Sequence, residues 1–275
     1  MYFKTLCHPS LIDADAQCKL KNRLVRTAAI ATMYGNAHRL FLQILTARRV
    51  LLGPEAKSTY EKCCAQFNVA ADNLQEFVLD INQQLEVMHL AVRKSIQEDS
   101  LTDTQCFVLV NLVNSDATKM ASTFSPQELS LFRSIIEEIV YSDDGLIQET
   151  EAISLATSME PRMKVSDSEE LIQHLIQDKW LLQHGGKERQ LSLSAVTASE
   201  LNLYLGEVYE DYVSKCFLCK IITFKGHRCT KCKVRVHRKC CRKFWMHQNT
   251  TSVTCPDPVC GEHWPHVELD LPQKR

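Results

Sequence analysis

Residues 216–240 read CFLCKIITFKGHRCTKCKVRVHRKC, and two more cysteines follow at positions 255 and 260. The spacing is Cys216-x2-Cys219-x9-Cys229-x2-Cys232-x4-His237-x2-Cys240-x14-Cys255-x4-Cys260. Two intervening residues let both sulfurs of a cysteine pair point at one ion from a single tight turn, and Zn²⁺ favours thiolate and imidazole ligands. One such pair is weak evidence, but two pairs followed by H-x2-C strongly indicate a zinc domain. Eight ligands predict two Zn²⁺ ions.

The order of the ligands indicates how they are shared. In the cross-brace of RING and PHD modules, the first and third pairs hold one ion, and the second and fourth pairs hold the other. This pattern predicts one site of Cys216, Cys219, His237 and Cys240, and a second of Cys229, Cys232, Cys255 and Cys260. A segment of about 50 residues with few large apolar side chains cannot fold alone, so metal binding is expected to supply about 10 kcal/mol or more. The residues expected to lie outside both sites are Cys241, His227, His247 and His263.

The rest of the chain has the composition of a helical globular protein. Its 275 residues are 45% hydrophobic and 24% charged and include only 8 Gly and 8 Pro, which favours two or three helix-rich domains. No apolar run approaches the roughly 18 residues of a membrane span, and the N-terminus lacks a signal pattern. We therefore expect a cytosolic or nuclear protein, where clustered cysteines bind metals more often than they form disulfides.

Charge is distributed unevenly along the sequence. Residues 215–247 contain eleven Lys or Arg and no Asp or Glu, although the net charge of the chain is −1. The cysteine cluster is thus a basic module on an acidic body. Lys231, Lys233 and Arg235 are the predicted face for nucleic acid or an acidic partner, and binding of DNA there would be salt-sensitive.

Helical periodicity dominates the N-terminal part of the chain. It predicts a helix over residues 38–52 that ends at Gly53-Pro54, a second over 55–66, and a third capped by Asp72. The apolar run Cys106–Val113 then predicts a strand.

A similar pattern follows. Ser125-Pro126-Gln127-Glu128 is a capping box that begins a helix, and SDDG at 142–145 ends it. Two further helices are expected over Glu149–Thr157 and Ser168–Asp178. Residues 179–194 read as a hairpin around Gly185-Gly186, and a last helix is expected over Ala195–Asp211.

Three helices closed by a hairpin is the winged-helix plan. We therefore predict a mostly α fold with small β-hairpins: tandem winged-helix domains followed by a cross-brace, RING-like C4HC3 zinc domain. The predicted boundaries are a poorly ordered extension at 1–32, winged-helix domains at 33–118 and 119–212, the zinc domain at 213–266 and a tail at 267–275. The helix at 168–178, SEELIQHLIQD, has three acidic residues and no Lys or Arg, which favours binding of protein over DNA.

Four further stretches are informative together: HRLFLQIL at 38–45, the segment 109–140, DKWL at 178–181 and CGEHWPH at 260–266. These stretches resemble the non-SMC element one family, the RING-like subunit of the SMC five/six DNA-repair complex. The resemblance implies stable pairing with a MAGE-type subunit through the winged-helix region, with a kleisin-like subunit and the SMC heterodimer in the same complex. It also implies action in the nucleus, on chromosomes, in recombinational repair, and a ubiquitin ligase activity stimulated by the MAGE-type partner.

A RING ligase positions a ubiquitin-charged conjugating enzyme and does no covalent chemistry itself. Its docking surface matches Leu218 between the first two ligands, Trp245 in the loop after Cys240, and Pro256. Two departures predict weak, partner-dependent activity. Gly261 and Glu262 stand where active RING domains often have a basic residue, and the last ligand pair is C-x4-C instead of the usual C-x2-C.

Three alternatives compete with the ligase. A scaffold whose zinc module only braces partner subunits would lack ligase activity. A PHD-type reader has the same ligand order but binds cationic tails, which this basic segment would repel. A diacylglycerol-binding module needs a histidine before Cys216 near position 203, where this chain has Leu203.

Overall fold

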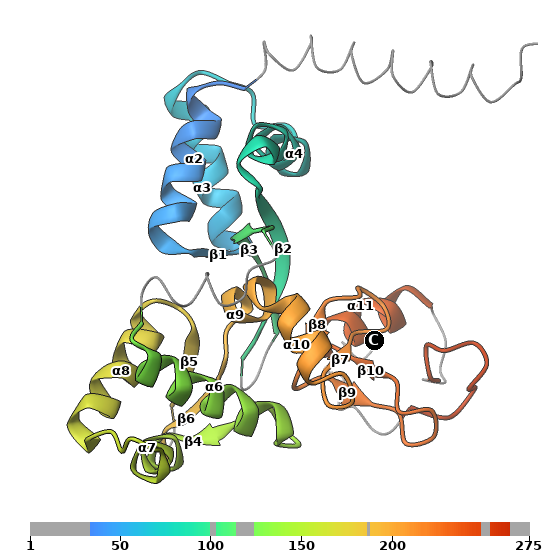
Figure 1. The fold of residues 1–275 in the computed structure, drawn as a ribbon. Helices are drawn as coiled ribbons and strands as arrows, with labels where there is room; N and C mark the ends of the chain where they lie inside the picture. Colours follow the sequence, from blue (N-terminus) through green and yellow to red (C-terminus); the bar gives the residue numbers. More distant parts are fainter. Residues whose placement is uncertain (1–33, 100–102, 114–123, 186–187, 249–253, 265–275) are drawn as a thin grey trace, which may run out of the picture.

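The computed structural model describes residues 34–99, 103–113, 124–185, 188–248 and 254–264. These residues form a first unit (34–113), a second unit (124–208) and a C-terminal unit (214–264) (Figure 1). Each unit has its own hydrophobic cluster. The predicted extension at 1–32 and the tail at 267–275 lie outside the described residues. Within the described part of the chain, no helix is long and apolar enough to cross a membrane.

The first unit packs three helices on a small antiparallel sheet. Its elements are α2 (Asn36–Arg48), β1 (Val50–Leu52), α3 (Gly53–Gln66), α4 (Leu74–Leu85), the 3₁₀ helix η1 (Glu86–Met88), β2 (Leu90–Glu98) and β3 (Asp103–Asn111). The strand order is β1-β3-β2. Phe41 and Leu45 of α2 pack with Ile81 of α4 in the core, where all three are fully buried.

Three predictions for this unit are wrong in detail. The first helix ends at Arg48, because Arg49 adopts a positive φ of 63° and Val50–Leu52 pair with β3 as a strand. Gly53-Pro54 begins α3, since proline suits the first helical turn, where its missing N–H has no partner to lose. The cap of α4 is Asn73, one residue after the expected Asp72; its side chain accepts a hydrogen bond from the Gln75 amide at 2.9 Å.

The second unit repeats the order of helices and strands found in the first. Its elements are α6 (Pro126–Tyr141), β4 (Ile147–Gln148), α7 (Glu149–Ser158), α8 (Val165–Gln177), β5 (Leu181–His184), β6 (Gln190–Leu193), α9 (Ala195–Glu200) and α10 (Asn202–Val208). The capping box of Ser125 and Glu128 is confirmed, and so is the antiparallel β5–β6 hairpin, although Gly186 of its expected turn lies outside the described residues. The predicted last helix is divided into two at Leu201.

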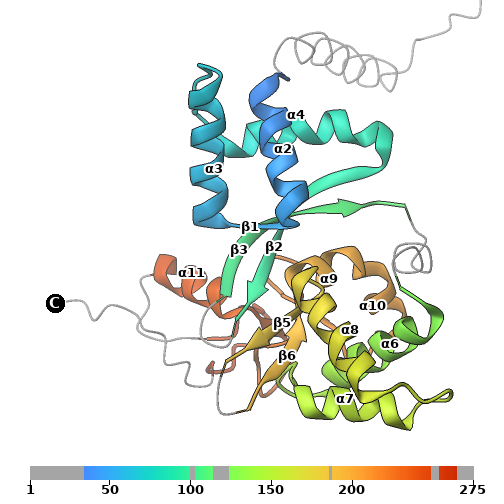
Figure 2. The same cartoon turned by 90° about the vertical axis from the view of Figure 1, so that its left-hand side faces the viewer.

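The units are joined through shared apolar clusters. Cys106 and Val108 of β3 pack against Ala195 and Val196 of α9. The C-terminal unit consists of β7 (Ser214–Lys215), β8 (Ile222–Thr223), β9 (His227–Arg228), β10 (Arg235–Val236) and α11 (Arg238–Gln248). Ile222 and Phe224 of this unit belong to the core of the second unit. Figure 2 shows α11 beside β3, with which it is in contact.

Candidate metal centres

Cluster 1 is formed by Cys216, Cys219, His237 and Cys240. Its four donor atoms all lie within 4.8 Å of one another. Cys216 and Cys219 lie between β7 and β8, His237 follows β10, and Cys240 lies in the first turn of α11. The imidazole Nδ1 is 3.3 Å from the sulfur of Cys219 and 3.9 Å from that of Cys240. His237 therefore presents Nδ1 to the sulfur atoms and turns Nε2 away from them.

Cluster 2 is formed by Cys229, Cys232, Cys255 and Cys260. Its donor atoms also lie within 4.8 Å of one another. The sulfur of Cys229 is 3.8 Å from that of Cys260, and the sulfur of Cys232 is 3.5 Å from that of Cys255. The structure thus brings the eight predicted ligands together in the interleaved groups expected of a cross-brace. Cys241 is buried outside both clusters, with its sulfur 3.8 Å from the Val236 carbonyl.

Both C-x2-C segments adopt the same turn. The Cys216 amide donates to the Ile221 carbonyl at 2.8 Å, and the Cys229 amide donates to the Val234 carbonyl at 2.8 Å. The residue after each second cysteine, Lys220 or Lys233, has a positive φ of 63°. Such a backbone is uncommon for a non-glycine residue. It turns the chain sharply enough for both sulfurs of each pair to face the same point.

The chemistry of the donors fits a soft divalent cation. Cluster 1 offers three sulfurs and one imidazole nitrogen, cluster 2 offers four sulfurs, and both sets are typical of structural zinc sites. Burial lowers the pKa of His237, but hydrogen bonds with Cys216 and Cys219 outweigh burial and raise this pKa to about 10. Hydrogen bonds with Cys219 and Cys240 lower the pKa of Cys216. Cluster 1 is therefore an environment that favours a positive charge, which a metal ion would supply.

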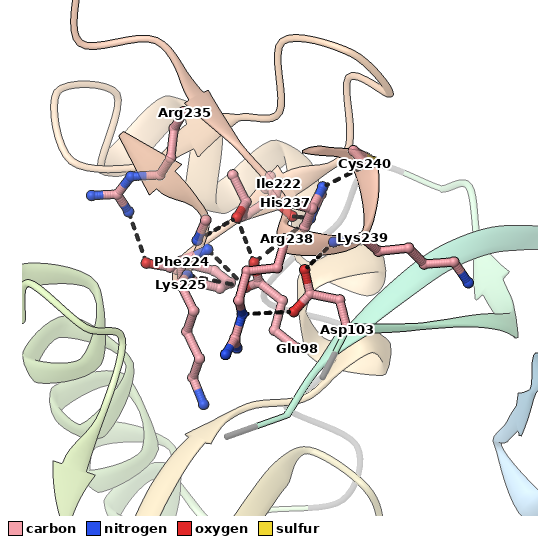
Figure 3. Close-up of polar contacts among 12 residues, drawn as sticks. Glu98, Asp103, Ile222, Phe224, Lys225, Arg235, His237, Arg238, Lys239 and Cys240 are labelled. Carbon is pink, nitrogen blue, oxygen red and sulfur yellow. Dashed lines mark hydrogen bonds and ion pairs between the residues drawn. The ribbon is translucent and has the colours of Figure 1, made fainter. Parts of the chain in front are cut away.

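Two carboxylates of the first unit reach the segment that holds cluster 1 (Figure 3). Glu98, the last residue of β2, is 6% exposed and accepts hydrogen bonds from the amides of Phe224 at 2.8 Å and Lys225 at 3.3 Å. Asp103, the first residue of β3, accepts from the Lys239 amide at 3.2 Å and pairs with Arg238 at 3.3 Å. Neither residue stands out in the sequence, because both lie far from the ligands along the chain and match no motif.

The residues expected to dock a conjugating enzyme lie in different environments. Leu218 lines a groove of about 690 Å³ together with Ile96 of β2 and Phe244 of α11. Pro256 is half-buried. Trp245, in contrast, is only 4% exposed, lies on α11 instead of in a loop, and donates from Nε1 to the Thr254 carbonyl at 3.2 Å. The structure therefore corrects the interpretation of Trp245, whose ring belongs to the core of the C-terminal unit.

The predicted basic face is also only partly exposed. Lys231 is 63% exposed and lies 3.7 Å from Glu262. Lys233 is exposed, and its ammonium donates to the Thr230 carbonyl. Arg235 is directed inward: its Nη1 donates to the Phe224 carbonyl at 2.8 Å, and burial lowers its pKa. Arg235 is therefore half-buried and held against the backbone, whereas the two lysines are exposed.

A chain of Asp, His and Ser lies where the three units meet. Asp99 Oδ1 is 3.3 Å from His184 Nδ1, and His184 Nε2 is 2.7 Å from Ser192 Oγ. This order resembles a hydrolase triad, but Ser192 is only 2% exposed and the Lys225 ammonium also lies 3.0 Å from His184 Nε2. A nucleophile must be accessible to its substrate. This arrangement therefore acts as a polar junction between the units.

Comparisons with known proteins agree on one family. Residues 38–197 match the family described as "Nse1 non-SMC component of SMC5-6 complex". The chain is 31% identical over 234 residues to "Non-structural maintenance of chromosomes element 1 homolog" of Bos taurus, covering 84% of this chain and 85% of that protein. It is 24% identical over 220 residues to "Non-structural maintenance of chromosomes element 1" of Schizosaccharomyces pombe, covering 80% of this chain and 90% of that protein. A chain of a solved structure titled "Nse1-Nse3-Nse4 complex" superposes with a TM-score of 0.70 at 30% identity, covering 85% of this chain and 98% of that one.

Proposed function

Because this chain belongs to the Nse1 family of non-SMC components of the SMC5-6 complex, we propose that it is the RING-type ubiquitin ligase subunit of that complex. In this proposal two Zn²⁺ ions, one in each cluster, stabilise residues 213–266. The zinc unit then positions a ubiquitin-charged conjugating enzyme for attack by a lysine. The interleaving of the two four-donor clusters, with Leu218 on the surface between two ligands, is the observation that carries the proposal.

The helical units are proposed to be winged-helix domains at residues 33–118 and 119–212. Each follows the order helix, strand, helix, helix, strand, strand, and in each the last two strands pair as an antiparallel hairpin. The matched solved structure is titled as a complex with Nse3 and Nse4. We therefore assign to these domains the binding of a MAGE-type subunit, with a kleisin-type subunit and the SMC heterodimer in the same assembly. Recombinational DNA repair and chromosome maintenance in the nucleus follow from membership of that complex.

A ligase of this type only positions the conjugating enzyme, so its essential feature is the surface on which that enzyme docks. The groove beside cluster 1 is lined by the apolar side chains of Ile96, Leu218 and Phe244 and by the lysines Lys94, Lys239 and Lys243. Among the described residues, no Asp or Glu lines this groove, and a positive patch favours encounter with an acidic partner surface. Gly261 and Glu262 follow the last ligand, where a cation would help to hold ubiquitin, so weak activity without the MAGE-type partner is expected.

The test is single-turnover discharge of ubiquitin from a charged conjugating enzyme. It compares the chain alone, the chain with its MAGE-type partner, and the Leu218→Ala variant with the partner. Met246→Ala is the matched control, because Met246 is 53% exposed on α11 in the C-terminal unit and is not among the residues that line the groove. The proposal predicts discharge that needs the partner, fails in Leu218→Ala and persists in Met246→Ala.

A scaffold without enzymatic activity is the second candidate, and one observation favours it. Residues Lys94–Ile96 of β2 line the same groove as Leu218, so the first unit occupies part of the space beside the docking residue. Absence of discharge in every arm, with two zinc ions bound and the partner complex intact, would establish the scaffold and reject the ligase.

A further inference from the structure

We propose that Glu98, at the end of β2 in the first unit, is a positioning residue for the metal ion of cluster 1. Its carboxylate orients His237 and the turn beside it, so that metal binding and docking of the β2–β3 hairpin stabilise each other. This inference rests on the proposed zinc occupancy of cluster 1 and on no assumption about ligase activity.

The orientation of His237 is the first observation. Its Nδ1 faces the sulfurs of cluster 1, and its Nε2 lies 3.1 Å from the Ile222 carbonyl and 3.7 Å from Glu98 Oε1. A metal-bound histidine usually donates its second N–H to a carbonyl or carboxylate, which fixes the ring and makes the ligating nitrogen more basic. Both kinds of acceptor face Nε2 here. The side chains of His237 and Glu98 are 0% and 7% exposed, so water does not replace them.

Glu98 also fixes the position of the Ile222 carbonyl, the other acceptor that faces His237 Nε2. Its two oxygens accept hydrogen bonds from the Thr223 hydroxyl and from the amides of Phe224 and Lys225, directly after Ile222 (Figure 3). The carboxylate therefore fixes the turn from which the Ile222 carbonyl projects. Loss of the negative charge would weaken the attraction for Nε2 directly, and loss of an acceptor would loosen the turn.

Asp103 provides a second anchor on the opposite strand. It pairs with Arg238 and accepts from the Lys239 amide, and these two residues lie between the ligands His237 and Cys240. Glu98 thus holds residues 223–225, beside His237, and Asp103 holds the two residues that separate the ligands of the third pair. Both come from one hairpin of the first unit.

The register of the hairpin indicates that its end is built for this contact. Glu98 lies directly opposite Asp103 across the β2–β3 ladder, and both side chains are nearly buried. Like charges opposite each other destabilise a sheet. The C-terminal unit compensates by supplying backbone amides, the Arg238 guanidinium and the imidazole of His237. Without that unit in place, two facing carboxylates would repel each other.

Coupling of this kind is reciprocal. If Glu98 helps to retain the metal ion, then loss of the ion must loosen the hairpin. The β2–β3 pair also packs against α9, so the effect would extend from the metal centre into the body of the chain. Cluster 2 makes no contact with Glu98 among the described residues and serves as an internal reference.

The test measures zinc release from the full chain under excess chelator, with a metal-sensitive dye as the readout. Glu98→Gln keeps the size of the side chain and removes its charge and one acceptor. Glu86→Gln is the matched control, because Glu86 is exposed in η1 of the same unit. We expect two ions in all three proteins. One of them should leave Glu98→Gln about 10-fold faster than the wild type, while the other is unchanged.

A second measurement needs no variant. Hydrogen exchange of the wild-type amides in Leu90–Glu98 and Asp103–Asn111 is expected to accelerate after chelation. The role of Glu98 would be overturned if both ions left Glu98→Gln at the wild-type rate. It would also be overturned if chelation left hydrogen exchange in these strands unchanged. Either result would leave the proposed metal centres intact. A wild-type chain that holds no zinc would overturn the proposed metal centres and this inference together.

Discussion

At the residue scale, three neighbouring cations of the C-terminal unit have different roles. Lys231 and Lys233 are exposed, whereas the Arg235 guanidinium is bound to the Phe224 carbonyl. A charge pattern in the sequence gives only the sign of each side chain, and its direction depends on the strand that carries it. The basic face therefore stays a prediction, and it rests on the two exposed lysines.

Charge reversal separates these roles. Lys231→Glu with Lys233→Glu is expected to weaken DNA binding by the full chain and to flatten its dependence on salt, because fewer counterions are released. Fluorescence anisotropy with labelled DNA at several salt concentrations measures this effect. DNA affinity that is the same in the lysine variant and the wild type would exclude this face as a DNA site.

Arg235→Ala is expected to lower the free energy of unfolding by about 1–3 kcal/mol, because the Phe224 carbonyl loses its partner. Denaturant titration measures this effect.

The grouping of the eight candidate metal ligands was predictable from sequence because paired cysteines have a characteristic spacing. The carboxylates that contact the ligand segments were not predictable. Glu98 and Asp103 come from another unit, and no local pattern links them to His237. Trp245 was assigned to a surface because its position after a ligand matches a docking residue. The structure instead packs its ring against Trp264, with centroids 5.3 Å apart.

At the element scale, helix starts were more predictable than strands. The capping box of α6 is explicit in the sequence and confirmed, because the Ser125 hydroxyl and Glu128 side chain satisfy each other's amides. Strand β2 was missed, since its buried side chains include Ser95, Gln97 and Glu98, which break the alternation that identifies strands. These polar residues are buried against other units, so their burial depends on the whole molecule. Strand β1 was merged into the first helix because it is only three residues long and lies in the four-residue connection between α2 and α3.

The cap of α6 offers a controlled stability test. Ser125→Ala is expected to cost about 1 kcal/mol, because it removes the acceptor for the Glu128 amide. Ser130→Ala is the control, since Ser130 is exposed inside the same helix and alanine has the higher helix propensity. Urea denaturation should therefore show a lower free energy of unfolding for Ser125→Ala and a slightly higher one for Ser130→Ala. Equal effects at both positions would argue against the cap.

The turn after α6 offers a second controlled test of stability. Gly145 has a φ of 69°, and a Cβ there would lie 2.7 Å from Cβ of Phe224 in the C-terminal unit. Gly145→Ala is expected to destabilise the chain by about 1–2 kcal/mol from the backbone alone, with the clash in addition. Gly206→Ala is the matched control, because nothing lies within 4 Å of that position in α10, and alanine there should stabilise by about 1 kcal/mol. A thermal melt in which Gly145→Ala equals the wild type would contradict the close approach.

At the scale of the whole molecule, the C-terminal unit is bound to both other units. Ile222 and Phe224 lie in the core of the second unit, and Glu98 and Asp103 of the first unit hold residues 223–225 and residues 238–239. This arrangement was not predictable from the sequence, because contacts between units depend on single side chains far apart in the chain. It explains how a small C-terminal unit can keep a fixed orientation relative to the rest of the chain. The proposed ligase function, which acts by positioning, would require such a fixed orientation.

Two metal ions are proposed to hold the C-terminal unit in a cross-brace. This arrangement can be tested by removing one ion from the full zinc-loaded chain with limiting chelator, alkylating the exposed thiols and mapping them by mass spectrometry. The cysteines are expected to react as two sets: Cys216, Cys219 and Cys240 in one, and Cys229, Cys232, Cys255 and Cys260 in the other. Joint protection of Cys216, Cys219, Cys229 and Cys232 against the remaining cysteines would mean that ligands are shared in sequence order, and would contradict the cross-brace.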